Sequence, residues 1–185
     1  MKELIALAKA EPGKLDYASA GNGSVIHLAM ELFKSMAGVN ITHVPYKGAP
    51  QGFTDVLGGH VALIFITVPL ALPHVKTERL RVLGIASAKR ALQLPQIPTI
   101  SESGVPSFEI STWAGVLAPA RAPQAIVTRV QDAVVKVARS PETRAQFDAQ
   151  GSDAVGSSAA EFAAMLLVEK EKYVRAVKVA GIKLE

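Results

Sequence analysis

The sequence contains no cysteine, which excludes disulfides, thiol nucleophiles and cysteine-based zinc sites. It also lacks an apolar run long enough to span a bilayer. The longest such run, Val61–Leu72, is interrupted by Thr67 and Pro69, and a buried strand is the better interpretation of its first half. The histidines show neither HxH nor HExxH spacing, so no metal site is expected.

Blocks of like charge are absent as well. Lys and Arg are scattered, with a formal net charge of +4, and they are not interleaved with aromatic residues. No nucleic-acid partner is therefore expected. A mild basic excess suits a small anionic ligand, although many soluble proteins share it. With 49% apolar residues the chain can bury a core, and disorder is not expected.

Strand-like and helix-like segments alternate through the first part of the chain. Met1 leads directly into a helical pattern over residues 3–10, so we expect no signal peptide in this chain. Each later apolar segment is followed by residues at helical spacing, an order typical of a parallel sheet covered by helices. The expected strands are 15–19, 41–46, 61–66 and 80–86, and the helices between them contain Leu28–Met36, 52–57 and 70–76.

The remainder of the chain has a different pattern. Residues 93–109 are rich in Pro, Ser and Glu and predict an extended connector before a strand over 112–117. Three helices are then expected, but no run of strands surrounds them. They begin near Pro123, at Ser140, and after a capping box formed by Ser158 and Glu161.

Several of these segments together resemble the Bug family, the solute receptors of tripartite tricarboxylate transporters. The resemblance covers essentially the whole chain in the family's order and spacing. It is carried by LDYASAGNGSVIHLAMELFKSMAGV, HVPYKGAPQGFTDVLGGHV, RLRVLGIASAKRALQLPQIPTISESGVPSFE and TWAGVLAPA.

The resemblance implies a type II periplasmic-binding-protein fold with two α/β domains hinged around a cleft. Residues 1–110 would form one nearly complete parallel domain, domain two of the family, and 111–185 the crossing strand and C-terminal helices of an incomplete domain one. The chain would then be a truncated reading frame or a fragment. The implied function is capture of a small carboxylate in the periplasm for membrane transporter subunits, with no catalysis and no cofactor.

The first candidate site is the glycine-containing turn of Ser19, Gly21, Asn22, Gly23 and Ser24. It is expected between a strand and a helix, where free N–H groups and the helix dipole attract an anion. A capped turn that binds nothing is the alternative. The Walker lysine is absent, so a phosphate-loop enzyme is rejected.

Three further segments are candidates for the cleft. Gly48 and Ala49 follow a strand at the same sheet edge and offer backbone contacts, whereas Lys47 is expected to be solvated. Thr67 ends the apolar strand where the family usually carries an Asp-Asn pair, and this departure suggests an apolar or purely anionic ligand. Thr112 and Trp113 begin the strand that borders the cleft in the family, and a place in the cleft wall is favoured for Trp113 over the alternative of a core residue.

Two alternatives to solute binding remain open. Ser24 and His27 suggest a hydrolase, but no G-x-S-x-G elbow and no orienting acid accompany them. The other is a non-binding remnant that self-associates. The helices at about 123–139 and 159–180 carry apolar stripes that include Val127, Val130 and Phe162. Contiguous exposed apolar patches of this kind are typical of interfaces, so we expect either a homodimer through these helices or a chain prone to aggregate.

Overall fold

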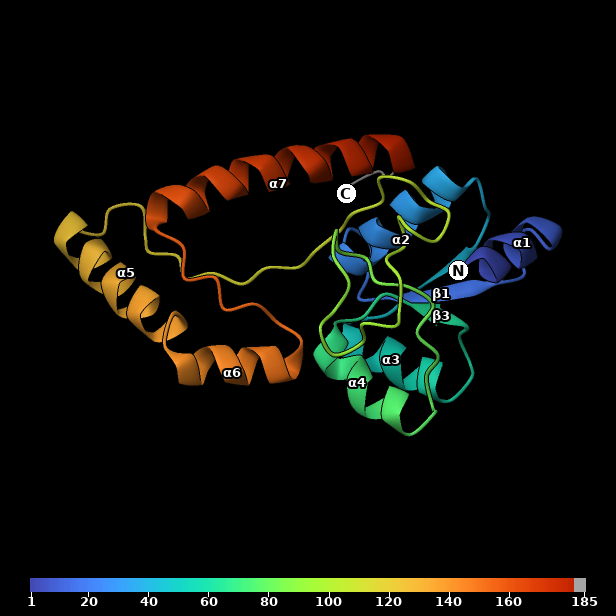
Figure 1. Ribbon diagram of the computed structural model, residues 1–185. Coiled ribbons are helices and arrows are strands. Elements are labelled where there is room, and N and C mark those ends of the chain that lie inside the picture. Colours follow the sequence, from blue (N-terminus) through green and yellow to red (C-terminus); the bar gives the residue numbers. More distant parts are fainter. Residues whose placement is uncertain (182–185) are drawn as a thin grey trace. The chain divides into compact units, whose positions relative to one another are not determined.

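The computed structural model describes residues 1–181 and divides into two compact units (Figure 1). The first comprises Met1–Thr112 with the residues from Lys172 onward, and the second comprises Trp113–Glu171. The last helix, α7 (Ala159–Ala180), contributes to both units. None of the described helices combines the length and the apolarity needed to cross a membrane.

A three-stranded parallel sheet forms the centre of the first unit. Its strand order is β2-β1-β3, with β1 at Asp16–Ser19, β2 at Thr42–Pro45 and β3 at Leu63–Ile64. The register places Ser19 opposite Pro45. Because both pairs are parallel, all three strands end at the same edge of the sheet. The predicted parallel α/β fold is confirmed.

Helices cover both faces of this sheet. They are α1 (Lys2–Ala10), α2 (Val25–Ala37), α3 (Ala49–Leu57) and α4 (Val68–Lys76). In Figure 1, α2 lies on one side of the strands, and α3 and α4 lie on the other.

Alternate residues of β1 explain this two-sided packing. Tyr17 is completely buried in a core with Met30 and Phe33 of α2. The next residue, Ala18, points to the opposite face, where Gly52 of α3 packs so closely that an added Cβ would lie 2.9 Å from Ala18 Cβ. The strand is therefore buried on both faces, as a central parallel strand should be.

Two expected strands are not formed, and those predictions were wrong. Residues 80–86 make only an isolated bridge between Ile85 and Thr99. A cavity of about 370 Å³, lined by both β3 and residues 79–86, separates this segment from the sheet. Residues 112–117 belong to no helix or strand in the part of the chain that the structure describes. Both segments have the composition of strands, yet a strand requires a neighbouring backbone with which to pair.

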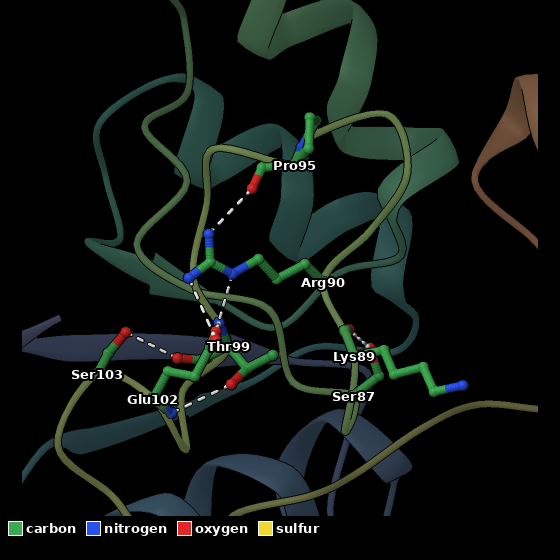
Figure 2. A network of polar contacts seen from close by, with 7 residues as sticks. All are labelled: Ser87, Lys89, Arg90, Pro95, Thr99, Glu102 and Ser103. Atoms are coloured by element: carbon green, nitrogen blue, oxygen red, sulfur yellow. Dashed lines mark hydrogen bonds and ion pairs between the residues drawn. The ribbon is translucent and has the colours of Figure 1, made fainter.

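The connector after residue 86 is held by a network centred on Arg90 (Figure 2). The guanidinium donates to both carboxylate oxygens of Glu102, at 3.0 and 3.2 Å, and to the carbonyl of Pro95. Glu102 also accepts from the backbone N–H of Thr99 at 2.7 Å, while Thr99 Oγ1 accepts from the N–H of Glu102. These bonds lower the pKa of Glu102 to about 2, the one with Arg90 contributing most.

Removing this carboxylate should destabilise the protein in a pH-dependent way. The depressed pKa means that ionised Glu102 stabilises the fold above its ordinary pKa and loses that effect as the pH falls toward 2. We expect Glu102→Gln to lower the free energy of unfolding at pH 7, and the difference from wild type to shrink below about pH 4.5. Urea titrations between pH 7 and 2.5 would measure it. Glu3→Gln, which removes the exposed pair with Arg81, is the matched control and should change little.

The second unit contains α5 (Gln124–Ala138), α6 (Pro141–Gln150) and the first part of α7. The predicted caps are confirmed: Ser140 Oγ accepts from the N–H of Thr143, and Ser158 and Glu161 form a reciprocal capping box. Neither α5 nor α6 has a buried residue. The start of α6 is thus marked by a side-chain cap, whereas α5, which follows Pro123, has none.

Candidate functional site

The turn from Ser19 to Ser24 connects β1 to α2 at the edge where the three strands end. The loop after β2 lies beside it, because the N–H of Tyr46 donates to the carbonyl of Ser19 at 3.1 Å. A Cβ on Gly21 would lie 3.2 Å from the carbonyl oxygen of Tyr46. Gly21 also has a φ of +112°, so both its conformation and the close contact require glycine. The structure therefore brings two of the predicted site segments together.

Internal hydrogen bonds fix the shape of this turn. The N–H of Gly21 donates to Ser19 Oγ at 3.1 Å, and the N–H of Ser24 donates to the carbonyl of Gly21 at 3.2 Å. The N–H of Gly23 donates to Nδ1 of His27 at 3.1 Å. Ser24 caps α2 by accepting from the N–H of His27 at 3.3 Å. The turn is thus organised by the protein alone.

The Ser24–His27 contact is a helix cap and not a nucleophile–base pair. It joins Ser24 Oγ to the backbone N–H of His27, whereas the imidazole Nδ1 accepts from Gly23. The ring is thus not placed to take the Ser24 proton, which argues against the hydrolase alternative.

Three helices begin at this edge, and each start coincides with a predicted site segment. Val25 and Ile26 open α2, and no hydrogen bond of the described chain engages their N–H groups. Gly48 precedes α3 and Thr67 precedes α4, and neither has a side chain capping its helix. No acidic residue lies in the first turn of any of the three. Unpaired donors and helix dipoles there favour an anion.

The exposure of the predicted site residues differs. Asn22, Lys47 and Thr67 are exposed, Gly21, Gly23, Gly48 and Ala49 are partly buried, and Ser19 is completely buried. Thr112 and Trp113 lie at the boundary between the two units. Trp113 is 45% exposed and packs edge-to-face on Phe162 of its own unit. Its part in a ligand site stays a prediction.

A column of stacked rings beneath the turn was not predicted from the sequence. The rings of His27 and His43 are parallel with centroids 4.1 Å apart, and Tyr17 stacks on His43 at 4.8 Å. His43 Nε2 lies 2.6 Å from Ser19 Oγ. The parallel register of β1 and β2 could have revealed part of this column, because it places Tyr17 opposite His43.

Both imidazoles are held in the neutral form. Burial is the main cause that lowers the pKa of His43, to about 4, and the adjacent His27 lowers it further. Burial also lowers the pKa of His27, against an opposing effect of Glu31. Tyr17 donates to Glu31 at 2.6 Å, and burial and this bond raise the pKa of its hydroxyl. The two histidines therefore add no positive charge beside the turn.

Neutral His43 makes the fold sensitive to mild acid. Because its pKa is depressed in the folded protein, the free energy of unfolding should fall as the pH drops from about 6.5 toward 4. We expect His43→Gln, which cannot be protonated, to show a shallower decline than wild type. Denaturant unfolding at several pH values in that window would test this, with exposed His60→Gln as the control. Equal slopes for wild type and His43→Gln would contradict it.

The cavity beside β3 is not lined by any predicted site residue. Its lining is mostly apolar, including Phe65, Val82 and Leu83, with two arginines at 79 and 81.

Comparison with known proteins identifies the family. The profile of the tripartite tricarboxylate transporter family receptor matches residues 1–182. The chain belongs to this family. Its fold is that of the periplasmic binding proteins, as the resemblance implied. The chain spans about half the length of the curated relatives it matches, between 51% and 56% for the first three.

Several solved structures are similar, and three of them are described here. Rpa4515 of R. palustris with adipate is 34% identical, with a TM-score of 0.93 over 98% of this chain and 61% of that one. The periplasmic binding protein BugD is 26% identical, with a TM-score of 0.89 over 100% of this chain and 62% of that one. MatC from Rhodopseudomonas palustris with bound malate is 25% identical, with a TM-score of 0.82 over 97% and 60%. One of these is thus a periplasmic binding protein, and the other two are complexes with a dicarboxylate.

Proposed function

We propose that this chain binds a small dicarboxylate at the edge where β1, β2 and β3 end. The observation that carries the proposal is the pair of unengaged N–H groups of Val25 and Ile26 at the start of α2, next to a preformed glycine turn. The adipate and malate complexes of similar proteins support this ligand class. The exposed amide of Asn22 and the hydroxyls of Ser24 and Thr67 would supply further donors.

The charge of the site fits a ligand held mainly by the backbone. The first turns of α2, α3 and α4 hold no acidic residue that would repel a carboxylate. Lys47, in the loop after β2, is exposed and suits long-range attraction better than a buried ion pair. Binding would then depend on fixed N–H groups and ordered water, which tolerate several chain lengths of ligand.

The family supports the wider role as a proposal. We propose that the chain acts in the periplasm without catalysis and delivers its ligand to membrane subunits of a tripartite transporter. We also propose that residues 1–110 correspond to domain two of longer relatives and 111–185 to part of domain one. If so, the relatives' remaining half would supply further ligand contacts, and adipate binding by this chain alone would be weak.

A proline substitution would test the backbone N–H directly. Proline is tolerated at the first position of a helix, and Ser24 already has the extended conformation preferred before proline. Val25→Pro therefore removes one N–H and leaves α2 intact. We expect about tenfold weaker adipate binding, since hydrogen bonds to charged groups contribute roughly 1.5–3 kcal/mol. Isothermal titration or NMR titration would measure it.

Val25→Ala is the matched control, because it shortens the same side chain and keeps the N–H. It should bind adipate within about twofold of wild type. Equal affinities for the proline and alanine variants would show that this N–H does not hold the ligand. Failure of the wild-type chain to bind any of adipate, malate or succinate would contradict the proposed function itself.

Self-association is the second candidate, and the exposed stripe of α5 favours it. Ile126, Val130, Val134 and Val137 lie at helical spacing and are between 39% and 60% exposed. We propose that this stripe pairs with that of a second copy. Light scattering should then give a dimer mass that Val130→Glu and Val134→Glu together reduce to a monomer. Thr128→Glu, on the opposite side of α5, should leave the dimer unchanged. A monomeric wild-type chain at high micromolar concentration would refute the pairing.

A further inference from the structure

We propose that His27 and His43 are positioning residues that hold the Ser19–Ser24 turn in its ligand-binding shape. The inference rests on the proposed function, which places the ligand at this turn. In this proposal neither imidazole contacts the ligand. Each acts through one backbone or side-chain atom of the turn, and the two rings support each other by stacking.

His43 fixes the first residue of the turn. Its Nε2 lies 2.6 Å from Ser19 Oγ, which also accepts from the N–H of Gly21 and lies 3.3 Å from the carbonyl of Gly21. Ser19 is completely buried, so its hydroxyl is committed to these contacts and is not placed to reach a ligand. Among the predicted site residues, Ser19 is thus better explained as the link between His43 and the glycine turn.

His27 fixes the far end of the same turn. Its Nδ1 accepts from the N–H of Gly23 at 3.1 Å, which requires a lone pair on Nδ1 and places the proton of the neutral ring on Nε2. Gly23 has a φ of +74°, a conformation that the chain adopts at little cost only with glycine. The bond from Gly23 therefore holds an otherwise flexible residue directly before the cap of α2.

Stacking brings the rings of His27 and His43 into direct contact. The ring planes of His27 and His43 are within 10° of parallel, and Tyr17 continues the column at 16° to His43. The charged groups nearby are Glu31 and Lys34 of α2, which pair with each other, and Glu31 also accepts from Tyr17. Two imidazoles 4.1 Å apart face to face favour the state in which neither is protonated. That is also the state in which Nδ1 of His27 can accept from Gly23.

Conservative variants separate this role from simple packing. Asparagine at position 27 can place its amide oxygen near the position of Nδ1, whereas alanine cannot accept from Gly23. Glutamine at position 43 can likewise reach the place of Nε2. We expect His27→Ala to weaken adipate binding about tenfold and His27→Asn to restore it to within about threefold of wild type. His43→Ala and His43→Gln should form a parallel pair. Exposed His60→Ala is the control and should bind like wild type.

Two NMR measurements test the positioning role without a ligand. Long-range proton–nitrogen spectra at pH 7 should show the His27 ring protonated on Nε2, and a ring protonated on Nδ1 would overturn the proposal. Hydrogen exchange of the Gly23 amide should accelerate about tenfold in His27→Ala and remain slow in His27→Asn. Thermal melts of each variant show whether it is folded. If the alanine variant does not fold, the positioning role is still tested by comparing His27→Asn with wild type and by the tautomer of His27 in wild type.

The outcomes distinguish this inference from the proposed function. Adipate binding by His27→Ala and His43→Ala equal to wild type would overturn the positioning role and leave the binding function standing. No adipate binding by wild type, together with the expected tautomer and Gly23 exchange, would refute the binding function while the histidines still hold the turn. Unchanged Gly23 exchange in His27→Ala would refute the positioning role in either case.

Discussion

Parallel pairing of β1 with β2 and β3 is the constraint on which the candidate site depends. Parallel strands end at one edge, and each strand here leads directly into a helix, so the N-termini of α2, α3 and α4 gather there. Backbone N–H groups at helix starts have no partner within their own helix. The edge therefore presents donors without any need for ionised side chains. The same register places Tyr17 opposite His43, which starts the ring column.

Local signals in the sequence predicted those parts of the fold that are decided locally. Ser140 marks the start of α6, because its side chain accepts from the N–H of Thr143. Ser158 and Glu161 likewise mark the start of α7. Each signal acts within one helical turn, so distant parts of the chain are not needed to interpret it. The glycine turn before α2 belongs to the same class.

Features that depend on distant partners could not be predicted in this way. The segment 80–86 has an apolar composition typical of a strand, but β3 lies across a cavity from it and the two backbones do not pair. Composition reports whether a segment tolerates burial, and pairing depends on which backbone lies beside it. His27 and His43 are 16 positions apart in the sequence, so their stacking becomes visible only when β2 is placed beside β1. The buried state of Ser19 follows from the same placement.

A site built from neutral groups has consequences for selectivity. An ionised arginine would bind a carboxylate best in one orientation, because its paired donors are rigid. Helix N-termini reward negative charge with a broader tolerance of position, since their field falls off gradually over the first turn. The histidines would then make the turn rigid. They would hold Gly21 and Gly23 in conformations from which a glycine could otherwise move easily. If the turn binds a carboxylate as proposed, the shape of the turn, and not the charge of its side chains, would decide which carboxylates can approach the backbone.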